Sequence, residues 1–510
     1  MARLFTSNRP LPRWLIGLIA AAFFGLGLLL VLRHELWQDE WQAWLLARDS
    51  ASLTELLRNL RYEGHPALWH LGLFTLSRFT GNPLAMQLLH LLLASATVFI
   101  FLRCAPFAPG QTILFAFGYF PFFEFCAISR NYAAGVLLIF LFCAVFPRRG
   151  RGRLLALSAI LFLLAQTSVY GLFLAGALGV LLVAAGRMDG DTLPAPLRPE
   201  IWVGAALLAG GFLLSILQLV PPPDSGFAAG WKLEADPPHL LQTVGTIFNS
   251  YLPFPAMQYH FWGTNILLNP YLKFCLALLL LAYPVILFRR QPPLLAAFSL
   301  GTLAILAFTY TKYPGSLRHH GHLFILLLAC LWLSAYFPVK EGGRTVIARL
   351  SDFCRKNKDR WLTTLLTVQL AAGLFAAAMD LIYPFSAGQA AARYIREQHL
   401  DHLLLAGHED DAASVVGGCL RRRIYYLASD SWGSFVVWDR RRKSLNDKEI
   451  VTKTRQLAAG SRRDILLIVN RDLGSQGRSL TKLRQFTGGI VRAENYHLYL
   501  ARYDGGREER

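Results

Sequence analysis

The chain has 510 residues, of which 54% are hydrophobic and only 16% are charged, whereas soluble globular proteins average about 45–50% and about 25%. With a mean hydropathy of +0.38, this composition excludes a disordered, fibrous or purely soluble chain and indicates a polytopic membrane protein. We attribute the net charge of +19 to cytoplasmic loops, which carry excess Lys and Arg in membrane proteins, and expect no nucleic-acid partner.

Apolar runs along the chain predict about eleven transmembrane helices. The first run, residues 15–32, follows three arginines and is too long for the apolar core of a signal peptide, so we expect a span with its N-terminus in the cytoplasm. Further spans are predicted near residues 83–102, 108–127, 131–146, 154–170, 172–186, 201–220, 270–288, 294–310, 321–338 and 361–383. Seven Lys and Arg between residues 340 and 360 make the last inside loop the most basic, and an odd number of spans places the C-terminal tail outside.

Three stretches do not have the character of a span. In the first, Ser52 and Glu55 have the spacing of a helix-capping pair, and leucines on one face of the turns that follow predict an amphipathic helix in the interface plane. A second short amphipathic helix is expected after Pro66, ending at residues 81–83. The second stretch, residues 221–269, is rich in proline and aromatic residues and is predicted to be an outside loop.

The third stretch, from about residue 386 to residue 510, has the composition of a soluble domain. Apolar runs at 403–406 and 464–469, and an alternating run at 496–500 typical of a strand with one exposed face, predict strands with helices between them. We therefore expect two domains, a membrane domain over residues 1–385 and a small α/β domain outside the membrane over residues 386–510. Its basic clusters, residues 421–423 and 440–443, are interpreted as solvated surfaces or as contacts with anionic lipid.

Two adjacent acidic residues, Asp39 and Glu40, follow the first predicted span in the sequence HELWQDEWQAW. Adjacent residues on a helix point to different faces, so one carboxylate can face a substrate while the other orients it. Acidic residues also flank many spans without any catalytic role, and that alternative stays open. Trp37, Trp41 and Trp44 are interpreted as an interfacial aromatic belt.

Two further motifs place ionisable groups on the same side of the membrane. His65 lies in a Gly-His-Pro turn at a helix entrance, where anions are favoured, although a lone histidine is more often structural. Glu124 comes shortly before Arg130 and Tyr132, in an outside hairpin with the sequence Ser-Arg-Asn-Tyr. Ionisable groups at this depth are candidates for function; the alternative is a local ion pair between Glu124 and Arg130 that fixes the hairpin.

A basic cluster opens a late span from the outside. Arg318, His319, His320 and His322 lie within five residues, shortly after Lys312. Because positive charges on the outer face oppose the positive-inside rule, we interpret the cluster as a binding site for a phosphate at the bilayer surface. A metal site with His320 and His322 as ligands is the competing interpretation, which we do not favour because no matching Cys or His spacing occurs elsewhere. We therefore expect no cofactor.

Together these features resemble the GT-C glycosyltransferases that use polyprenyl-phosphate sugars, a class that includes protein O-mannosyltransferases and lipid A aminoarabinose transferases. The likeness rests on the acidic pair, the interfacial helices, the His-Pro turn, the Ser-Arg-Asn-Tyr hairpin and the late basic loop. It implies an α-helical GT-C membrane fold, with Asp39 as catalytic base beside Glu40, and with His65 and Arg318 holding the donor phosphate. Where relatives often have two prolines, this chain has Pro-Ala-Leu at residues 66–68, which leaves the acceptor open.

The residues alone predict the same chemistry. A polyprenyl-phosphate sugar has a good leaving group, so transfer needs one carboxylate to take the proton of the acceptor hydroxyl and cations to stabilise the departing phosphate. Both are expected on the outer face, which nucleotide sugars do not normally reach. We therefore expect an inverting glycosyltransferase of the bacterial inner membrane, with its active site facing the periplasm or exterior, and a lipid, glycan or protein acceptor.

Two other functions stay open. A ligase of the O-antigen-ligase type would share the basic outer cluster but would require a pyrophosphate lipid donor. A lipid or sugar transporter would form no covalent product, and we expect it to show inverted repeats or paired spans broken by Gly and Pro. The sequence shows neither of these transporter features.

Overall fold

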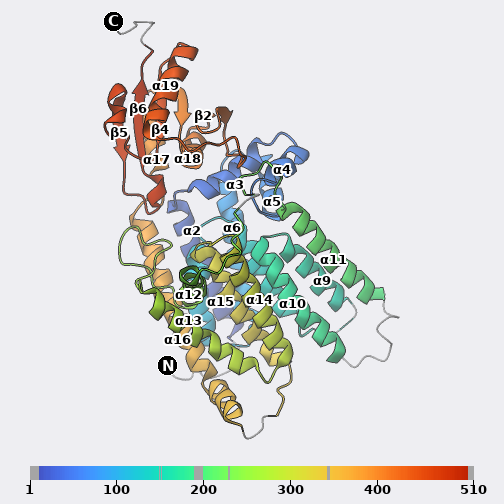
Figure 1. Ribbon diagram of the computed structural model, residues 1–510. Helices are drawn as coiled ribbons and strands as arrows, with labels where there is room; N and C mark the ends of the chain where they lie inside the picture. The colour runs from blue at the N-terminus through green and yellow to red at the C-terminus, as the bar shows by residue number, and fades with distance from the viewer. Residues whose placement is uncertain are drawn as a thin grey trace.

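The structure is a computed structural model and describes residues 11–148, 150, 152–188, 199–227, 230–341 and 345–503. Two of the three arginines expected in the cytoplasm at the N-terminus, and Arg344 of the basic segment, lie outside these residues. A bundle of helices forms the lower part of the molecule, and a small α/β domain lies above it (Figure 1).

The bundle contains helices with the length and composition of membrane spans. Seven described segments meet both conditions: α2 (Arg13–Arg33), α6 (Leu84–Cys104), α11 (Pro199–Leu219), α13 (Pro270–Phe288), α14 (Pro292–Thr311), α15 (Leu317–Leu333) together with the 3-10 turn η3 (Ser334–Tyr336), and α16 (Val346–Ile382). Three more helices have shorter apolar segments: α8 (Tyr132–Val145), α9 (Arg153–Ala165) and α10 (Val169–Met188), whose apolar segment is Val169–Ala185. The chain is therefore a multi-pass membrane protein. The count of eleven spans stays a prediction.

One predicted span is broken in the structure. Instead of a single helix over residues 108–127, the chain forms α7 (Pro109–Ala116) and a π-helix, η1 (Tyr119–Glu124). At the break Gly118 lies against α16, where a Cβ on Gly373 would come within 2.7 Å of the Gly118 carbonyl carbon. Two glycines thus let two backbones meet, a contact that the apolar composition of the run does not reveal.

The stretches that were not expected to span the membrane are more helical than the sequence predicts. The two expected helices are found as α4 (Leu53–Leu60) and α5 (Leu68–Ser77), and Ser52 accepts the N–H of Glu55 as its spacing predicts. Helix α4 is amphipathic as predicted, whereas α5 is apolar on nearly all sides and ends before residues 81–83. Helix α3 (Gln38–Asp49) precedes them and carries the acidic pair. A further helix, α12 (Pro237–Tyr251), lies in the stretch expected to be a loop. Its signal in the sequence is Asp236 followed by two prolines, a favoured start for a helix.

The α/β domain contains one six-stranded sheet with the strand order β3-β2-β1-β4-β6-β5. Its strands are β1 (Leu404–Gly407), β2 (Ile424–Tyr426), β3 (Ser431–Gly433), β4 (Ile465–Val469), β5 (Thr481–Phe486) and β6 (Tyr496–Ala501), and its helices are α17 (Gly388–Glu397), α18 (Asp410–Leu420) and α19 (Asp447–Ser461). Strand β1 runs parallel to β2 and β4, whereas β6 runs antiparallel to β4 and β5.

The prediction of an exposed face on the run at residues 496–500 is wrong. Strand β6 is buried along nearly its whole length. Tyr496 and Leu498 pack with residues of α17 and α18 on one face of the sheet, and Tyr499 packs with residues of α19 on the other. Helices therefore cover both faces, a tertiary effect that the alternation of the sequence cannot show.

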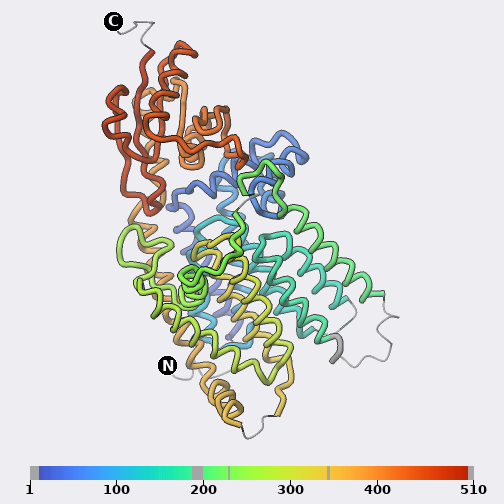
Figure 2. Tube along the Cα trace, viewed as in Figure 1, coloured from blue at the N-terminus to red at the C-terminus, as the bar shows by residue number. Residues whose placement is uncertain are grey.

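The α/β domain packs directly on α3, at the same end of the bundle as α4 and α5 (Figure 2). Trp41 and Trp44 are buried in one apolar cluster with residues of α17 and α18. A Cβ on Gly418 of α18 would lie 2.5 Å from the Trp41 ring, so this glycine allows the close contact. Trp37 is buried in the apolar core of the bundle. The interpretation of these tryptophans as an interfacial belt is therefore wrong, because protein and not lipid headgroups surrounds them.

Candidate active site

The acidic pair lies in the first turn of α3, and its two side chains point into different surroundings. Asp39 Oδ2 lies 3.1 Å from Nη2 of Arg318 and 3.5 Å from Nη2 of Arg130. Glu40 has no exposed surface and contacts neither of these arginines within salt-bridge distance. The structure thus places Asp39 with the cations and Glu40 in the protein interior.

Glu40 belongs to a buried network that fixes α3 to its neighbours. Its carboxylate accepts the backbone N–H of Ser129 at 2.6 Å and that of Trp37 at 3.2 Å, and it lies 3.0 Å from Nε2 of His34. Nδ1 of His34 lies 2.9 Å from Oδ2 of Asp380 on α16. Burial lowers the pKa of His34, but the carboxylates of Asp380 and Glu40 raise it well above its ordinary value. The imidazolium therefore joins two carboxylates, and Glu40 holds the hairpin that leads to the next residue of the site.

Arg130 follows Ser129 in this hairpin and is the next residue of the site. Its Nη1 donates a hydrogen bond of 2.6 Å to the carbonyl oxygen of Asp39, and its Nη2 lies 3.4 Å from Nε2 of His65. Burial, and to a smaller extent the charges of Arg130 and Arg318, lower the pKa of His65 to about 3. The imidazole is therefore neutral at physiological pH, and it orients Arg130 as a hydrogen-bond acceptor instead of adding a positive charge.

Glu124 does not form the local ion pair with Arg130 that was one of the two expectations. Its Oε1 accepts hydrogen bonds from the Tyr119 hydroxyl at 2.9 Å and from the Trp262 indole N–H at 2.8 Å. The Trp262 ring in turn lies 5.2 Å from the guanidinium of Arg318, which also lies 4.8 Å from the ring of Trp37. Glu124 therefore fixes one of two aromatic rings that flank Arg318, a contact typical of cation–π pairs. Trp262 was missed in the sequence, since nothing distinguishes it from other aromatic residues of its loop.

The three histidines after Arg318 all bond to nearby backbone. His319 Nδ1 accepts the N–H of Ser316 at 2.8 Å, and His320 and His322 each donate to a backbone carbonyl at 2.9 Å. The rings of His319 and His322 also pack against Tyr132 and Tyr170, with centroids 5.0 to 5.4 Å apart. These contacts order the start of α15, which carries Arg318 to Asp39.

Lys312 lies apart from this group of residues. Its Nζ donates to the carbonyl oxygen of Phe227 at 2.8 Å and lies 5.0 Å from the ring of Trp231. Of the residues predicted to bind phosphate, the structure therefore brings Arg318 and His65 together around Asp39 and Arg130. Across the described part of the chain, no group of three or more His, Cys, Asp or Glu side chains is arranged to hold a metal ion.

Comparisons with known proteins identify the fold. No family model and no curated protein matches the sequence. Among solved structures, the chain is similar to ArnT from Cupriavidus metallidurans in the apo state, with a TM-score of 0.55 and 12% identity over 96% of this chain and 97% of that one. It is also similar to the same protein bound to undecaprenyl phosphate, with a TM-score of 0.50 and 12% identity over 95% and 97% of the two chains. The expected GT-C fold with a small C-terminal domain is confirmed over nearly the whole chain.

Proposed function

We propose that the chain is an inverting membrane glycosyltransferase that moves a sugar from a polyprenyl-phosphate donor to an acceptor hydroxyl. The observation that carries the proposal is the position of the Asp39 carboxylate beside two guanidinium groups, those of Arg130 and Arg318. A proton acceptor and a pair of phosphate-binding cations thus meet at one point, at the end of the bundle where the α/β domain packs.

The two arginines have the properties of a phosphate site. Their side chains are only 11% and 12% exposed, so solvent screens their charges weakly. The Nε of each is buried and has no hydrogen-bond partner among the described residues. A phosphate at this position would accept N–H groups of both guanidinium ions in charge-assisted bonds. It would also replace Asp39 as their partner, which leaves the carboxylate available as a base.

The proposed step balances without a cofactor. The oxygen of the acceptor hydroxyl forms a bond to the anomeric carbon, and the bond from that carbon to the phosphate oxygen breaks. The hydroxyl proton goes to Asp39, and the electron pair stays on the polyprenyl phosphate, whose charge Arg130 and Arg318 stabilise. The phosphate leaves without protonation, so no second carboxylate acts as general acid, in contrast to glycoside hydrolysis. One displacement inverts the anomeric configuration.

The fold supports a lipid-linked donor. ArnT, which shares this fold, has been solved with undecaprenyl phosphate bound, and a polyprenyl chain suits a site at the end of apolar helices. We propose that this end faces the periplasm or exterior of a bacterial inner membrane, where the lipid-linked sugar is the available donor. The acceptor is a lipid, a glycan or a protein.

A donor panel tests the proposal. Purified protein is incubated with a set of polyprenyl-phosphate sugars and with polyprenyl-pyrophosphate sugars, and release or transfer of the sugar is measured. Turnover confined to the monophosphate donors is the expected result. Turnover confined to the pyrophosphate donors would favour the ligase alternative, and the absence of turnover with every donor would contradict a transferase.

A further inference from the structure

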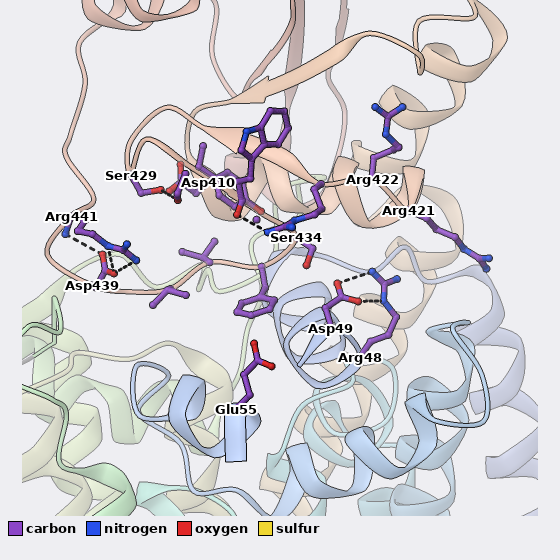
Figure 3. A pocket seen from close by; sticks show the side chains of 18 residues that line it. Arg48, Asp49, Glu55, Asp410, Arg421, Arg422, Ser429, Ser434, Asp439 and Arg441 are labelled. Atoms are coloured by element: carbon purple, nitrogen blue, oxygen red, sulfur yellow. Dashed lines mark hydrogen bonds and ion pairs between the residues drawn. The ribbon is translucent and has the colours of Figure 1, made fainter. Parts of the chain in front are cut away.

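A polar cavity lies between the α/β domain and helices α3 and α4, at the far end of α3 from Asp39 (Figure 3). Its volume is about 660 Å³, within the range of about 300–1,000 Å³ typical of small-molecule sites. Arg48 and Asp49 at the end of α3 and Glu55 on α4 form one side. The α/β domain forms the other side with residues that include Asp410, Arg423, Tyr426, Trp432 and Arg441. We call this space the interdomain cavity.

Two buried polar atoms in the wall of the interdomain cavity have no hydrogen-bond partner among the described residues. Oδ1 of Asp410 and the hydroxyl of Tyr426 belong to buried side chains, and neither finds a hydrogen-bond partner in the described part of the chain. The other carboxylate oxygen of Asp410 accepts from Arg442 at 3.0 Å. Since buried polar groups are nearly always hydrogen-bonded, an acceptor and a hydroxyl are available to a bound molecule.

The remaining lining groups define the chemistry of that molecule. Arg423 donates to the carbonyl of Trp432 at 3.0 Å, and the Trp432 side chain is 46% exposed. Arg48 pairs with Asp49, and Arg441 pairs with Asp439. Donors, acceptors and an aromatic ring together suit a saccharide, whose hydroxyls both donate and accept and whose C–H face packs on an aromatic ring. A bare phosphate suits the cavity less, because four carboxylates line it beside five arginines, and two of these arginines already pair with carboxylates.

The interdomain cavity is fixed relative to the proposed base. The side chain of Gln42, three residues after Asp39, donates to the carbonyl of Val436 in the cavity wall at 2.7 Å and accepts its N–H at 2.9 Å. Asp39 and Asp49 lie ten residues apart on the same helix, which corresponds to about 15 Å along its axis at about 1.5 Å per residue. One part of an extended molecule can therefore occupy the cavity while another part reaches Asp39.

We propose that the interdomain cavity binds a saccharide portion of the acceptor, remote from the hydroxyl that reacts. The proposal rests on the proposed function, since it names the class of acceptor as one that contains a glycan. The arginines at residues 421–423 are exposed, as expected of a solvated surface, and the proposal adds a saccharide ligand beside them. A flat contact with lipid headgroups does not require a concave site with buried, unpartnered acceptor and hydroxyl groups.

A glycan-binding experiment tests this proposal without any donor. The full-length protein, labelled with a fluorophore in detergent, is applied to an array of bacterial envelope oligosaccharides, and the strongest binder is then titrated in solution. We expect a small set of related saccharides to bind. Tyr426→Phe removes only the unpartnered hydroxyl, so the fold is retained and Kd rises roughly 3- to 10-fold, as for loss of one neutral hydrogen bond. Trp432→Ala, which removes the exposed ring, is expected to raise Kd by more than about 10-fold.

Tyr503→Phe is the matched control, because Tyr503 is an exposed tyrosine of the same domain outside the interdomain cavity. The Kd of this variant for the saccharide should equal that of the wild type. Absence of binding to every saccharide, or equal affinities in all variants, would overturn the proposal. Vesicles of phosphatidylglycerol and of phosphatidylcholine form the second arm. Preference for the anionic vesicles that is lost in Trp432→Ala, without saccharide binding, would assign the surface to the membrane. Because no donor is used, failure here is distinct from failure of the transferase proposal.

Discussion

Asparagine in place of Asp39 keeps the shape of the side chain but cannot take the proton of an acceptor hydroxyl. The structure predicts a small effect on folding. The Asp39 side chain is 28% exposed, and ion pairs of this kind contribute about 0–1 kcal/mol each, so its two pairs contribute at most about 2 kcal/mol. Arg130 also keeps its hydrogen bond to the Asp39 backbone carbonyl. The effect on transfer is expected to be much larger, roughly 10²–10⁴-fold, as for removal of a general base.

The assay compares sugar transfer, binding of polyprenyl phosphate and thermal unfolding in the wild type and in Asp39→Asn. Asp352→Asn is the control, because Asp352 also pairs with an arginine, Arg290, at 2.7 Å but lies outside the candidate site. Transfer near the wild-type rate in Asp39→Asn would refute the assignment of the base. If Glu40→Gln were then inactive, the two acidic residues would have exchanged roles, and if both variants were active the site would lie elsewhere.

Four further predictions follow from the same contacts. Arg318→Ala should weaken binding of polyprenyl phosphate by about 1.5–3 kcal/mol, the range for a hydrogen bond to a charged group. Arg318→Lys should recover only part of this binding energy. Equal affinity of the wild type and both variants in a titration would contradict the phosphate site. The pKa of His65 is lowered to about 3, mainly by burial, so this residue stays neutral at physiological pH. The affinity for polyprenyl phosphate should therefore have the same pH dependence in the wild type and in His65→Gln between about pH 5.5 and 8. A step near pH 6–7 in the wild type alone would show that His65 titrates. Burial raises the pKa of Glu494 from 4.5 to about 8, so the folded state binds this proton more tightly than the unfolded state. Stability should therefore fall as pH rises through that interval. In Glu494→Gln the unfolding temperature should fall less over the same interval, and parallel pH profiles of the two proteins would contradict this assignment. A reporter fused after residue 510 should be active outside the cytoplasm, and one inserted between α15 and α16 should be active inside; a cytoplasmic C-terminus would remove the argument for a lipid-linked donor.

The site residues that the sequence identified are those whose charge is unusual for their position. Asp39, Arg130 and Arg318 are ionisable groups next to apolar runs, where a charge without a purpose is disfavoured. The sequence could not show that they meet, because Asp39 and Arg318 are 279 residues apart in the chain. The partners that orient them escaped prediction for the same reason. His34 and Asp380, for example, are 346 residues apart.

The sequence predicted those parts of the fold that composition determines. It did not predict the parts that depend on how distant segments pack together. Long apolar runs gave the spans, since the bilayer sets both their length and their composition. The tryptophans of α3 show the limit of this reasoning. An interface with lipid headgroups and an interface with a second domain both favour large aromatic residues, so the pattern of Trp41 and Trp44 fits either one. The structure shows which one it is, because both rings are buried with residues of α17 and α18 and Gly418 lies close to the Trp41 ring.

The buried network around Glu40 favours the proposed transferase over a transporter. Alternating access requires groups of helices to move against each other around a binding site. Here Glu40 and His34 join α3, the hairpin at Ser129 and Asp380 of α16 in one buried network. Removing one partner of such a buried ion pair costs about 3–5 kcal/mol because the other charge is left buried, and we expect the three elements to keep these contacts during the reaction. A rigid arrangement is what catalysis requires, because charges that stabilise a leaving phosphate act most strongly when they are already in place.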